Sequence, residues 1–198
     1  MGGILISTCS ACIVSMELLR LQNVTQCLLS SASPSDHLIR YVLRMGPPTG
    51  KFSLTMVVPT LCVGRCICTR SCGFCNVATG KPLEADPFEP GRVANSVKLM
   101  NVKHAVITSV DRDDLPDGGS EIWAQTVRAI RHQSPGTTLE TLIPDFAGKW
   151  ENLARIIQVA PEIVSHNLET VRRLTKEVRI QAKYDRSLEV LRRLRQAG

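Results

Sequence analysis

Three cysteines, Cys68, Cys72 and Cys75, stand close together in a C-x3-C-x2-C run. This spacing offers three thiolates to a four-iron cluster and leaves one iron without a protein ligand. A cluster held entirely by cysteine mostly transfers electrons, whereas an iron with a vacant site can bind a small molecule and take part in its chemistry. The pattern therefore indicates an enzyme.

Zinc and disulfides fit these cysteines less well. Structural zinc normally takes four ligands, but only Cys72 and Cys75 form a C-x2-C pair, and the nearest downstream histidine, His104, is distant in the sequence. A disulfide framework is typical of short secreted chains, whereas the eight cysteines here lie in a chain of 198 residues. Iron and sulfur remain the favoured interpretation.

Two further cysteines, Cys62 and Cys66, offer other close spacings. Only the register that begins at Cys68 places an aromatic residue, Phe74, before its last cysteine. An apolar ring at that position would shield a cluster from water and help to set its potential. The alternative for Cys62 and Cys66 is that they are ordinary thiols at the end of a strand.

The cysteine motif with Phe74 resembles that of the radical S-adenosylmethionine (SAM) superfamily, and the sequence around it resembles one family within it, the lipoyl synthases. The resemblance extends from about Cys68 to the last residue. Four runs carry it, in the order of the family: Cys68-Thr-Arg-Ser-Cys-Gly-Phe-Cys-Asn-Val-Ala-Thr-Gly-Lys-Pro82, Thr108-Ser-Val-Asp-Arg-Asp-Asp-Leu-Pro-Asp-Gly-Gly119, Ile143-Pro-Asp-Phe146 and His166-Asn-Leu-Glu-Thr170. The cysteine motif alone would indicate only the superfamily.

The resemblance implies a sulfurtransferase that inserts sulfur at two carbons of a protein-bound octanoyl chain to make the lipoyl cofactor. It implies a 4Fe-4S cluster held by Cys68, Cys72 and Cys75, with SAM bound at the open iron. Its partners would be an octanoylated carrier, either the lipoyl domain of a 2-oxoacid dehydrogenase or the glycine cleavage H protein, and an electron donor such as flavodoxin or ferredoxin. The expected compartment is the cytoplasm, or alternatively the mitochondrial matrix.

The resemblance also implies positions for SAM. The turn Asp117-Gly118-Gly119 corresponds to a glycine-rich turn that lies against the amino group of SAM. Asn167 and Glu169 correspond to residues that bind the ribose hydroxyls of SAM. Arg179 corresponds to an arginine that meets a carboxylate. The alternatives are a plain turn before a helix at 117–119 and a loop that caps its own helix at 167–170.

Two further residues of these motifs, His166 and Arg112, are not assigned to SAM. His166 is interpreted as a packing or positioning residue rather than a base. Arg112 lies in the dense charged loop 111–114, where it either orders the site by pairing with a carboxylate or belongs to a solvated turn.

Some features of lipoyl synthases are missing. The family holds a second, auxiliary 4Fe-4S cluster through a C-x4-C-x5-C motif and a serine in an Arg-Ser-Ser-Tyr run. Neither is found: Cys9, Cys12 and Cys27 do not reproduce the spacing, and Ser187 is followed by Leu188. The chain is therefore expected to be a truncated lipoyl synthase. A non-catalytic cluster- or SAM-binding fragment and another radical SAM enzyme, such as a methylthiotransferase or biotin synthase, remain alternatives.

The elements that position these motifs alternate along the chain. Short β-rich runs predict strands at 54–61, 104–110, 137–143 and 162–165. Apolar residues at helical spacing predict three amphipathic helices between these strands, and Ser120 is predicted as the N-cap of the second. The apolar faces of the three helices consist of Val93, Val97 and Met100; of Ile122, Trp123, Val127 and Ile130; and of Trp150, Leu153, Ala154 and Ile157. A last helix is expected to begin near Arg186.

Repeated strand-helix units predict a parallel sheet that binds ligands at the carboxyl ends of its strands, where all four motifs lie. The predicted fold is α/β, a partial radical-SAM-type (β/α) barrel of about the first four strand-helix units. We expect this domain at residues 52–198, after a divergent and weakly structured N-terminal segment at 1–51.

Composition excludes other classes. Aromatic residues make up 4% of the chain, too few for a base-stacking surface, so no nucleic-acid partner is expected. Residues 1–30 are apolar but interrupted by serine, threonine and Glu17, and they lack the basic start of a secretory signal. They are expected to form a loosely packed helix or a poorly ordered end, and no membrane span is predicted.

Net charge is +6, and residues 151–198 carry ten lysines and arginines against six acids. Solvated helix faces explain most of this excess. A basic surface could also steer an acidic carrier toward the site.

Overall fold

The computed structural model describes residues 41–45, 52–57, 67–75 and 77–198, the first two ranges by their backbone. Four features named above lie outside these residues: the N-terminal run 1–30, the strand end at 58–61, Cys62 and Cys66. Within the part of the chain that is described, no helix is both long and apolar enough to cross a membrane.

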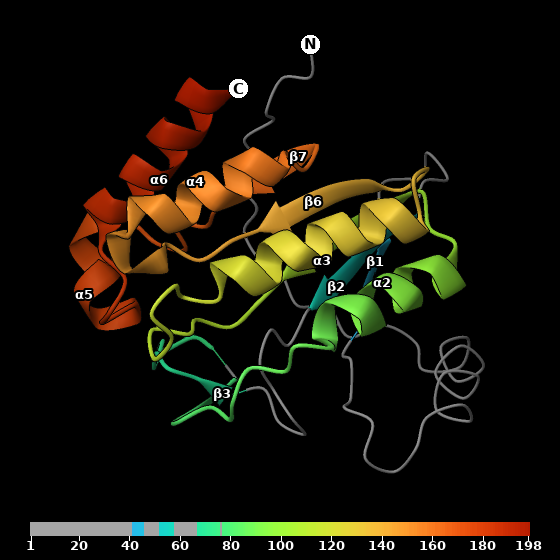
Figure 1. Ribbon diagram of the computed structural model, residues 1–198. Coiled ribbons are helices and arrows are strands. Elements are labelled where there is room, and N and C mark those ends of the chain that lie inside the picture. Colours follow the sequence, from blue (N-terminus) through green and yellow to red (C-terminus); the bar gives the residue numbers. More distant parts are fainter. Residues whose placement is uncertain (1–40, 46–51, 58–66, 76) are drawn as a thin grey trace.

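A five-stranded sheet, in the order β1-β2-β5-β6-β7, forms the centre of the molecule (Figure 1). Its strands are β1 (Tyr41–Met45), β2 (Phe52–Val57), β5 (His104–Thr108), β6 (Thr138–Leu142) and β7 (Ile163–Ser165). β2, β5, β6 and β7 are parallel and neighbour one another in chain order, while β1 pairs antiparallel with β2. The carboxyl ends of the four parallel strands therefore meet at one edge.

Helices follow each parallel strand. α2 (Glu89–Met100), α3 (Ser120–Gln133) and α4 (Trp150–Val159) lie side by side across one face of the sheet (Figure 1). After β7 come the 3-10 helix η2 (Arg172–Leu174), α5 (Thr175–Val178) and α6 (Tyr184–Ala197). The four predicted strand-helix units are thus confirmed. The last helix begins at Tyr184, slightly before the predicted start.

The core lies between this helical layer and the sheet. It is made of fully buried side chains from alternate strand positions and from the inner helix faces, among them Val93, Val97, Ala105, Ile107, Trp123, Val127, Ile130, Leu139, Leu153, Ile156, Val190 and Leu194. The alternation in β5, where Ala105 and Ile107 are buried, is that of a sheet covered on this face.

The predicted buried face of α4 is partly wrong. Leu153 is buried as predicted, but Ile156 and Val159 take the other core positions, and Ala154 is exposed. Trp150 and Ile157 are half-buried because α6 packs beside them, with the Arg193 guanidinium 4.3 Å from the centre of the Trp150 ring. Periodicity cannot separate a face that contacts the sheet from one that contacts a neighbouring helix.

Several short elements were not predicted. β3 (Ile67–Cys68) and β4 (Ala78–Thr79) form a two-residue parallel pair, and β1 falls within the N-terminal segment 1–51. A 3-10 helix, η1 (Phe146–Gly148), follows β6. β3, β4 and η1, with two or three residues each, are too short to show a period.

Candidate functional site

The loops that follow β5, β6 and β7 meet the cysteine loop at the carboxyl edge of the sheet. The Thr69 N–H donates to the carbonyl oxygen of Asp111, 3.1 Å away, and the Thr69 hydroxyl lies 2.9 Å from the same oxygen. On the other side, the Gly73 N–H donates to the carbonyl of Val178 at 2.9 Å. The cysteine loop is therefore held between the β5 loop and the segment after α5.

The three cysteines differ in exposure. Cys68 is buried against Val110 and Val77, Cys72 is half-buried, and Cys75 is exposed; none forms a disulfide. Burial raises the pKa of the Cys68 and Cys72 thiols above the ordinary value. An iron cluster must therefore displace these protons when it binds.

The donor set consists of three cysteines on one loop, and cysteine thiolates are the ligands that hold iron–sulfur clusters. Among the residues that the structure describes, no three Cys, His, Asp or Glu side chains are gathered closely enough for one metal ion. Phe74, beside Cys75, is 53% exposed, and the shielding of a bound group by its ring stays a prediction.

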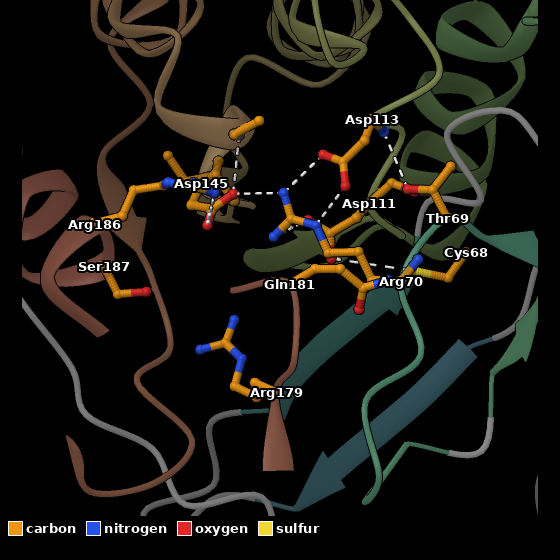
Figure 2. Close-up of polar contacts among 12 residues, drawn as sticks. Cys68, Thr69, Arg70, Asp111, Asp113, Asp145, Arg179, Gln181, Arg186 and Ser187 are labelled. Atoms are coloured by element: carbon orange, nitrogen blue, oxygen red, sulfur yellow. Dashed lines mark hydrogen bonds and ion pairs between the residues drawn. The ribbon is translucent and has the colours of Figure 1, made fainter. Parts of the chain in front are cut away.

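A buried arginine inside the cysteine motif joins three carboxylates (Figure 2). The Arg70 side chain is 2% exposed, and its nitrogens lie 2.6 Å from Asp113, 2.6 Å from Asp145 and 3.2 Å from Asp111. Arg186, from α6, lies 3.2 Å from the second oxygen of Asp145. We call these five residues the Arg70 network. The sequence does not reveal this network, because Arg70 fills one of the variable positions between two cysteines of the motif.

The acids of the network respond differently to burial. Burial raises the pKa of Asp111 to about 6, and the opposing effect of Arg70 is offset by the nearby carboxylates of Asp145 and Asp113. For Asp145, burial acts in the same direction, but hydrogen bonds from Arg70 and the Ala147 N–H outweigh it and lower the pKa. Asp145 is therefore the firmly ionised centre of the network.

Arg112 is buried and pairs with Asp114 through two short contacts of 2.7 and 2.8 Å. It also donates to the carbonyl of Leu83 at 2.9 Å. Of the two interpretations from the sequence, pairing with a carboxylate is confirmed. Arg112 ties the 111–114 loop to the segment that follows the cysteines.

The turn at 117–119 is shaped by its glycines and by the carboxylate of Asp117. Gly118 and Gly119 have φ of 59° and 82°, a left-handed backbone that favours glycine. Asp117 accepts hydrogen bonds from the N–H groups of Gly119 at 3.0 Å and Glu121 at 2.9 Å. The prediction that Ser120 caps α3 is wrong: α3 begins at Ser120, Gly119 holds the N-cap position, and Asp117 supplies the acceptor.

Replacing Asp117 by alanine is expected to lower the free energy of unfolding by about 1 kcal/mol, because the first turn of α3 loses its side-chain acceptor. Chemical denaturation of the cluster-free protein measures this. The control is Asp117→Asn, which keeps an acceptor oxygen and should lose less. Equal stability of wild type and Asp117→Ala would contradict the capping role.

His166 is a buried positioning residue in the structure. Its Nδ1 lies 2.8 Å from the carbonyl oxygen of Ile143, and its Nε2 lies 2.9 Å from the hydroxyl of Ser187 in α6. Nδ1 must carry the proton to meet the carbonyl, so Nε2 accepts from Ser187. Burial lowers the pKa of His166 below its ordinary value of 6.5. The histidine thus joins the end of β6 to α6 in its neutral form.

The lowered pKa of His166 predicts a dependence of stability on pH. The unfolded chain takes up this proton near pH 6.5 and the folded chain takes it up only at a lower pH, so stability is lost as pH falls below about 6.5. Between pH 7.5 and 5.5 this residue should therefore lower the free energy of unfolding. Urea unfolding of the cluster-free protein should show this loss in wild type and in His104→Gln, but not in His166→Gln. An identical pH profile in His166→Gln would contradict it.

Three of the predicted SAM-binding residues lie together after β7. The Asn167 amide donates to Glu169 at 2.8 Å, and Arg179 Nη1 donates to the carbonyl of Asn167 at 2.8 Å. The backbone of Arg179 forms an isolated antiparallel bridge with Cys72. Arg179 Nε is buried and has no hydrogen-bond partner among the residues that the structure describes. A buried donor without a partner marks a position where an anionic group would fit.

Asp117 lies apart from this group. Its described contacts run to α3 and to Arg155 of α4, 3.5 Å away, rather than to the loop after β7. Gly118 is closer to the network, because a side chain there would come within 3.2 Å of Phe146, the residue after Asp145.

Comparison with known proteins agrees with this geometry. The family model of the radical SAM superfamily matches residues 65–198. The chain belongs to the radical SAM superfamily. It is 70% identical over 132 residues to "Lipoyl synthase" of Flavobacterium johnsoniae, covering 67% of this chain and 46% of that protein. It is also 70% identical over 132 residues to "Lipoyl synthase, mitochondrial" of Nematostella vectensis, covering 67% and 45%.

The chain spans about half the length of the curated relatives it matches. A solved structure of methylornithine synthase matches with a TM-score of 0.52 at 13% identity, covering 67% of this chain and 39% of that one, and it shows the fold alone. The predicted partial radical SAM barrel is thereby confirmed. Membership of the radical SAM superfamily implies, in general, a 4Fe-4S cluster and SAM.

Proposed function

We propose that the chain acts as a radical SAM sulfurtransferase of lipoyl synthase type, which inserts sulfur at two carbons of a protein-bound octanoyl chain to form the lipoyl cofactor. The observation that carries the proposal is the position of the cysteine loop against Arg179, whose buried Nε has no partner. The identity of 70% over 132 residues to a lipoyl synthase supports this reaction among those of radical SAM enzymes.

Cys68, Cys72 and Cys75 would hold the cluster, and Arg179 would bind the carboxylate of SAM. Asn167 and Glu169 would bind its ribose hydroxyls. When bound, the reduced cluster and SAM supply the radical that removes a hydrogen atom from an unactivated carbon. The protein's own part would be to bind, to orient and to exclude water, and we assign part of the last role to the exposed ring of Phe74.

The turn 117–119 would approach the amino group of SAM through its backbone. Both oxygens of Asp117 already accept hydrogen bonds from the start of α3. We therefore assign Asp117 the role of fixing the turn, and Gly118 and Gly119 the close approach that only residues without a side chain permit.

The partner would be an octanoylated carrier domain with an acidic surface, such as a lipoyl domain or the glycine cleavage H protein. Exposed basic residues on η2, α5 and the start of α6 would attract it; Arg173, Lys176 and Lys183 have no ion pair within the described part of the chain. These elements flank Arg179, so an approaching carrier would be steered to the site. A flavodoxin or ferredoxin would supply the electron.

A second candidate function is cluster and SAM binding without sulfur insertion. The sequence contains no C-x4-C-x5-C motif, so the ligands of the auxiliary cluster are not found. Either function places the chain in a reducing compartment, the cytoplasm or the mitochondrial matrix, where thiols stay reduced.

Anaerobic reconstitution separates these functions. The protein is loaded with iron and sulfide, and SAM, a reductant and an octanoylated carrier domain are added. About four irons per chain, 5′-deoxyadenosine and lipoylated carrier would support sulfur insertion. Nucleoside without lipoylated carrier would favour the second function, and the absence of any cluster would contradict both.

A further inference from the structure

Arg70 lies between the first two cysteines of the loop, yet its side chain points away from solvent and into the carboxyl edge of the sheet (Figure 2). Its guanidinium contacts Asp111 and Asp113 after β5 and Asp145 after β6. The contact with Asp113 is bidentate, with distances of 2.6 and 2.7 Å. One side chain therefore links the cysteine loop to the ends of two strands.

Backbone contacts fix the same segments in register. The Thr69 N–H and hydroxyl both reach the carbonyl of Asp111, and the N–H of Asp113 donates to the Thr69 hydroxyl at 3.1 Å. The N–H of Arg70 itself lies 3.4 Å from Cys68 Sγ, and its carbonyl accepts from the hydroxyl of Thr79 at 3.2 Å. Movement of Arg70 would thus displace Cys68 directly.

The network also extends to α6. Asp145 is fully buried and receives Arg70 on one oxygen and Arg186 on the other. Three carboxylates share two guanidinium groups, so removal of Arg70 would leave Asp111 and Asp113 without their partner in the network, while Asp145 would keep Arg186. Asp111 Oδ2 lies 4.0 Å from Cys68 Sγ. At this distance the negative charge of the Asp111 carboxylate acts on the sulfur.

We propose that Arg70 is a positioning residue for the iron-sulfur cluster: it holds the Cys68–Cys72 part of the loop against β5 and β6 and neutralises the carboxylates beside Cys68. This role rests on the proposed function, since it concerns the same cluster. Arginine suits it because a planar fork reaches several carboxylates at once. A lysine ammonium is a single point charge on a flexible stem.

The chain offers a matched control. Arg112 is as buried as Arg70, with a side chain 2% exposed, and it also pairs bidentately with an aspartate, Asp114. It lies between two partners of Arg70 in the sequence, and its contacts with Asp114 and the Leu83 carbonyl do not include a cysteine. Arg112→Gln therefore creates a comparable buried defect while leaving the contacts of Arg70 with its three carboxylates in place.

The first experiment needs no cluster. Hydrogen exchange of the full cluster-free chain is compared for wild type, Arg70→Gln, Arg70→Lys and Arg112→Gln. We expect faster exchange at residues 68–75 in both Arg70 variants, while Arg112→Gln leaves that stretch unchanged. Unchanged exchange in Arg70→Gln, or equal acceleration in Arg112→Gln, would overturn the proposal.

The second experiment uses the reconstituted protein. Iron loss to a chelator should be roughly 10- to 100-fold faster in Arg70→Gln than in Arg112→Gln, the range seen when residues that orient metal ligands are removed. The midpoint potential of the remaining cluster should become more negative, because the positive charge of Arg70, which favours reduction, is removed. Equal iron retention and potential in both variants would overturn the proposal. A wild type that takes up no cluster would instead contradict the proposed function, and hydrogen exchange would still decide whether Arg70 holds the loop.

Discussion

Replacement of Cys72 by alanine should abolish cluster binding. Cys72 is the central cysteine of the motif, its backbone pairs with Arg179, and its carbonyl accepts from the N–H of Cys75 at 3.1 Å. With two thiolates left, the loop cannot hold a four-iron cluster, so iron should fall from about four per chain to background, and 5′-deoxyadenosine should disappear with it. Iron analysis, visible absorbance and the nucleoside assay measure these changes.

The neighbouring residue supplies the control for this prediction. Ser71 is exposed, and its backbone N–H, which a substitution keeps, lies 3.3 Å from the Gln181 side-chain oxygen. Ser71→Ala should therefore retain the full iron content. A Cys72→Ala protein that still binds about four irons would show that the ligands have been assigned wrongly.

Loss of Arg179 should have the second-largest effect, a fall in the affinity for SAM. Its Nε is buried without a partner, and a carboxylate of SAM placed there would form a charge-assisted hydrogen bond. Removing one member of such a pair costs about 2–5 kcal/mol, which corresponds to a rise in Kd of roughly 30-fold to several thousandfold. Equilibrium binding of SAM to reconstituted Arg179→Met measures this rise. Arg179→Lys should recover only part of the affinity, because it restores the charge without the planar fork.

Arg173 provides a matched comparison, because it is an exposed arginine on the adjacent η2. Arg173→Met should leave the affinity for SAM unchanged and, under the carrier proposal, weaken only the interaction with the carrier at low salt. Arg179 also donates to the carbonyl of Asn167, so the unfolding free energy of Arg179→Met must be measured in parallel. Unaltered affinity for SAM in a stable Arg179→Met protein would exclude this arginine from the site.

The sequence by itself determined the repeating units and the reactive loop. The β-rich runs at 104–110 and 137–143 contain β5 and β6, in which buried residues alternate with more exposed ones along each strand. The order of the motifs placed the cysteines, Asp111, Asp145 and Asn167 after successive strands, and parallel strands bring their carboxyl ends to one edge.

Only the tertiary structure decided which polar residues meet at that edge. Arg70 and Asp145 are 75 positions apart, and neither spacing nor periodicity connects them. The sequence predicted Ser120 as the N-cap of α3, whereas in the folded turn Gly119 holds that position and Asp117 supplies the acceptor. Buried charges must find partners wherever the packed elements place them, so their pairing depends on distances that exist only once the sheet and its helices have assembled.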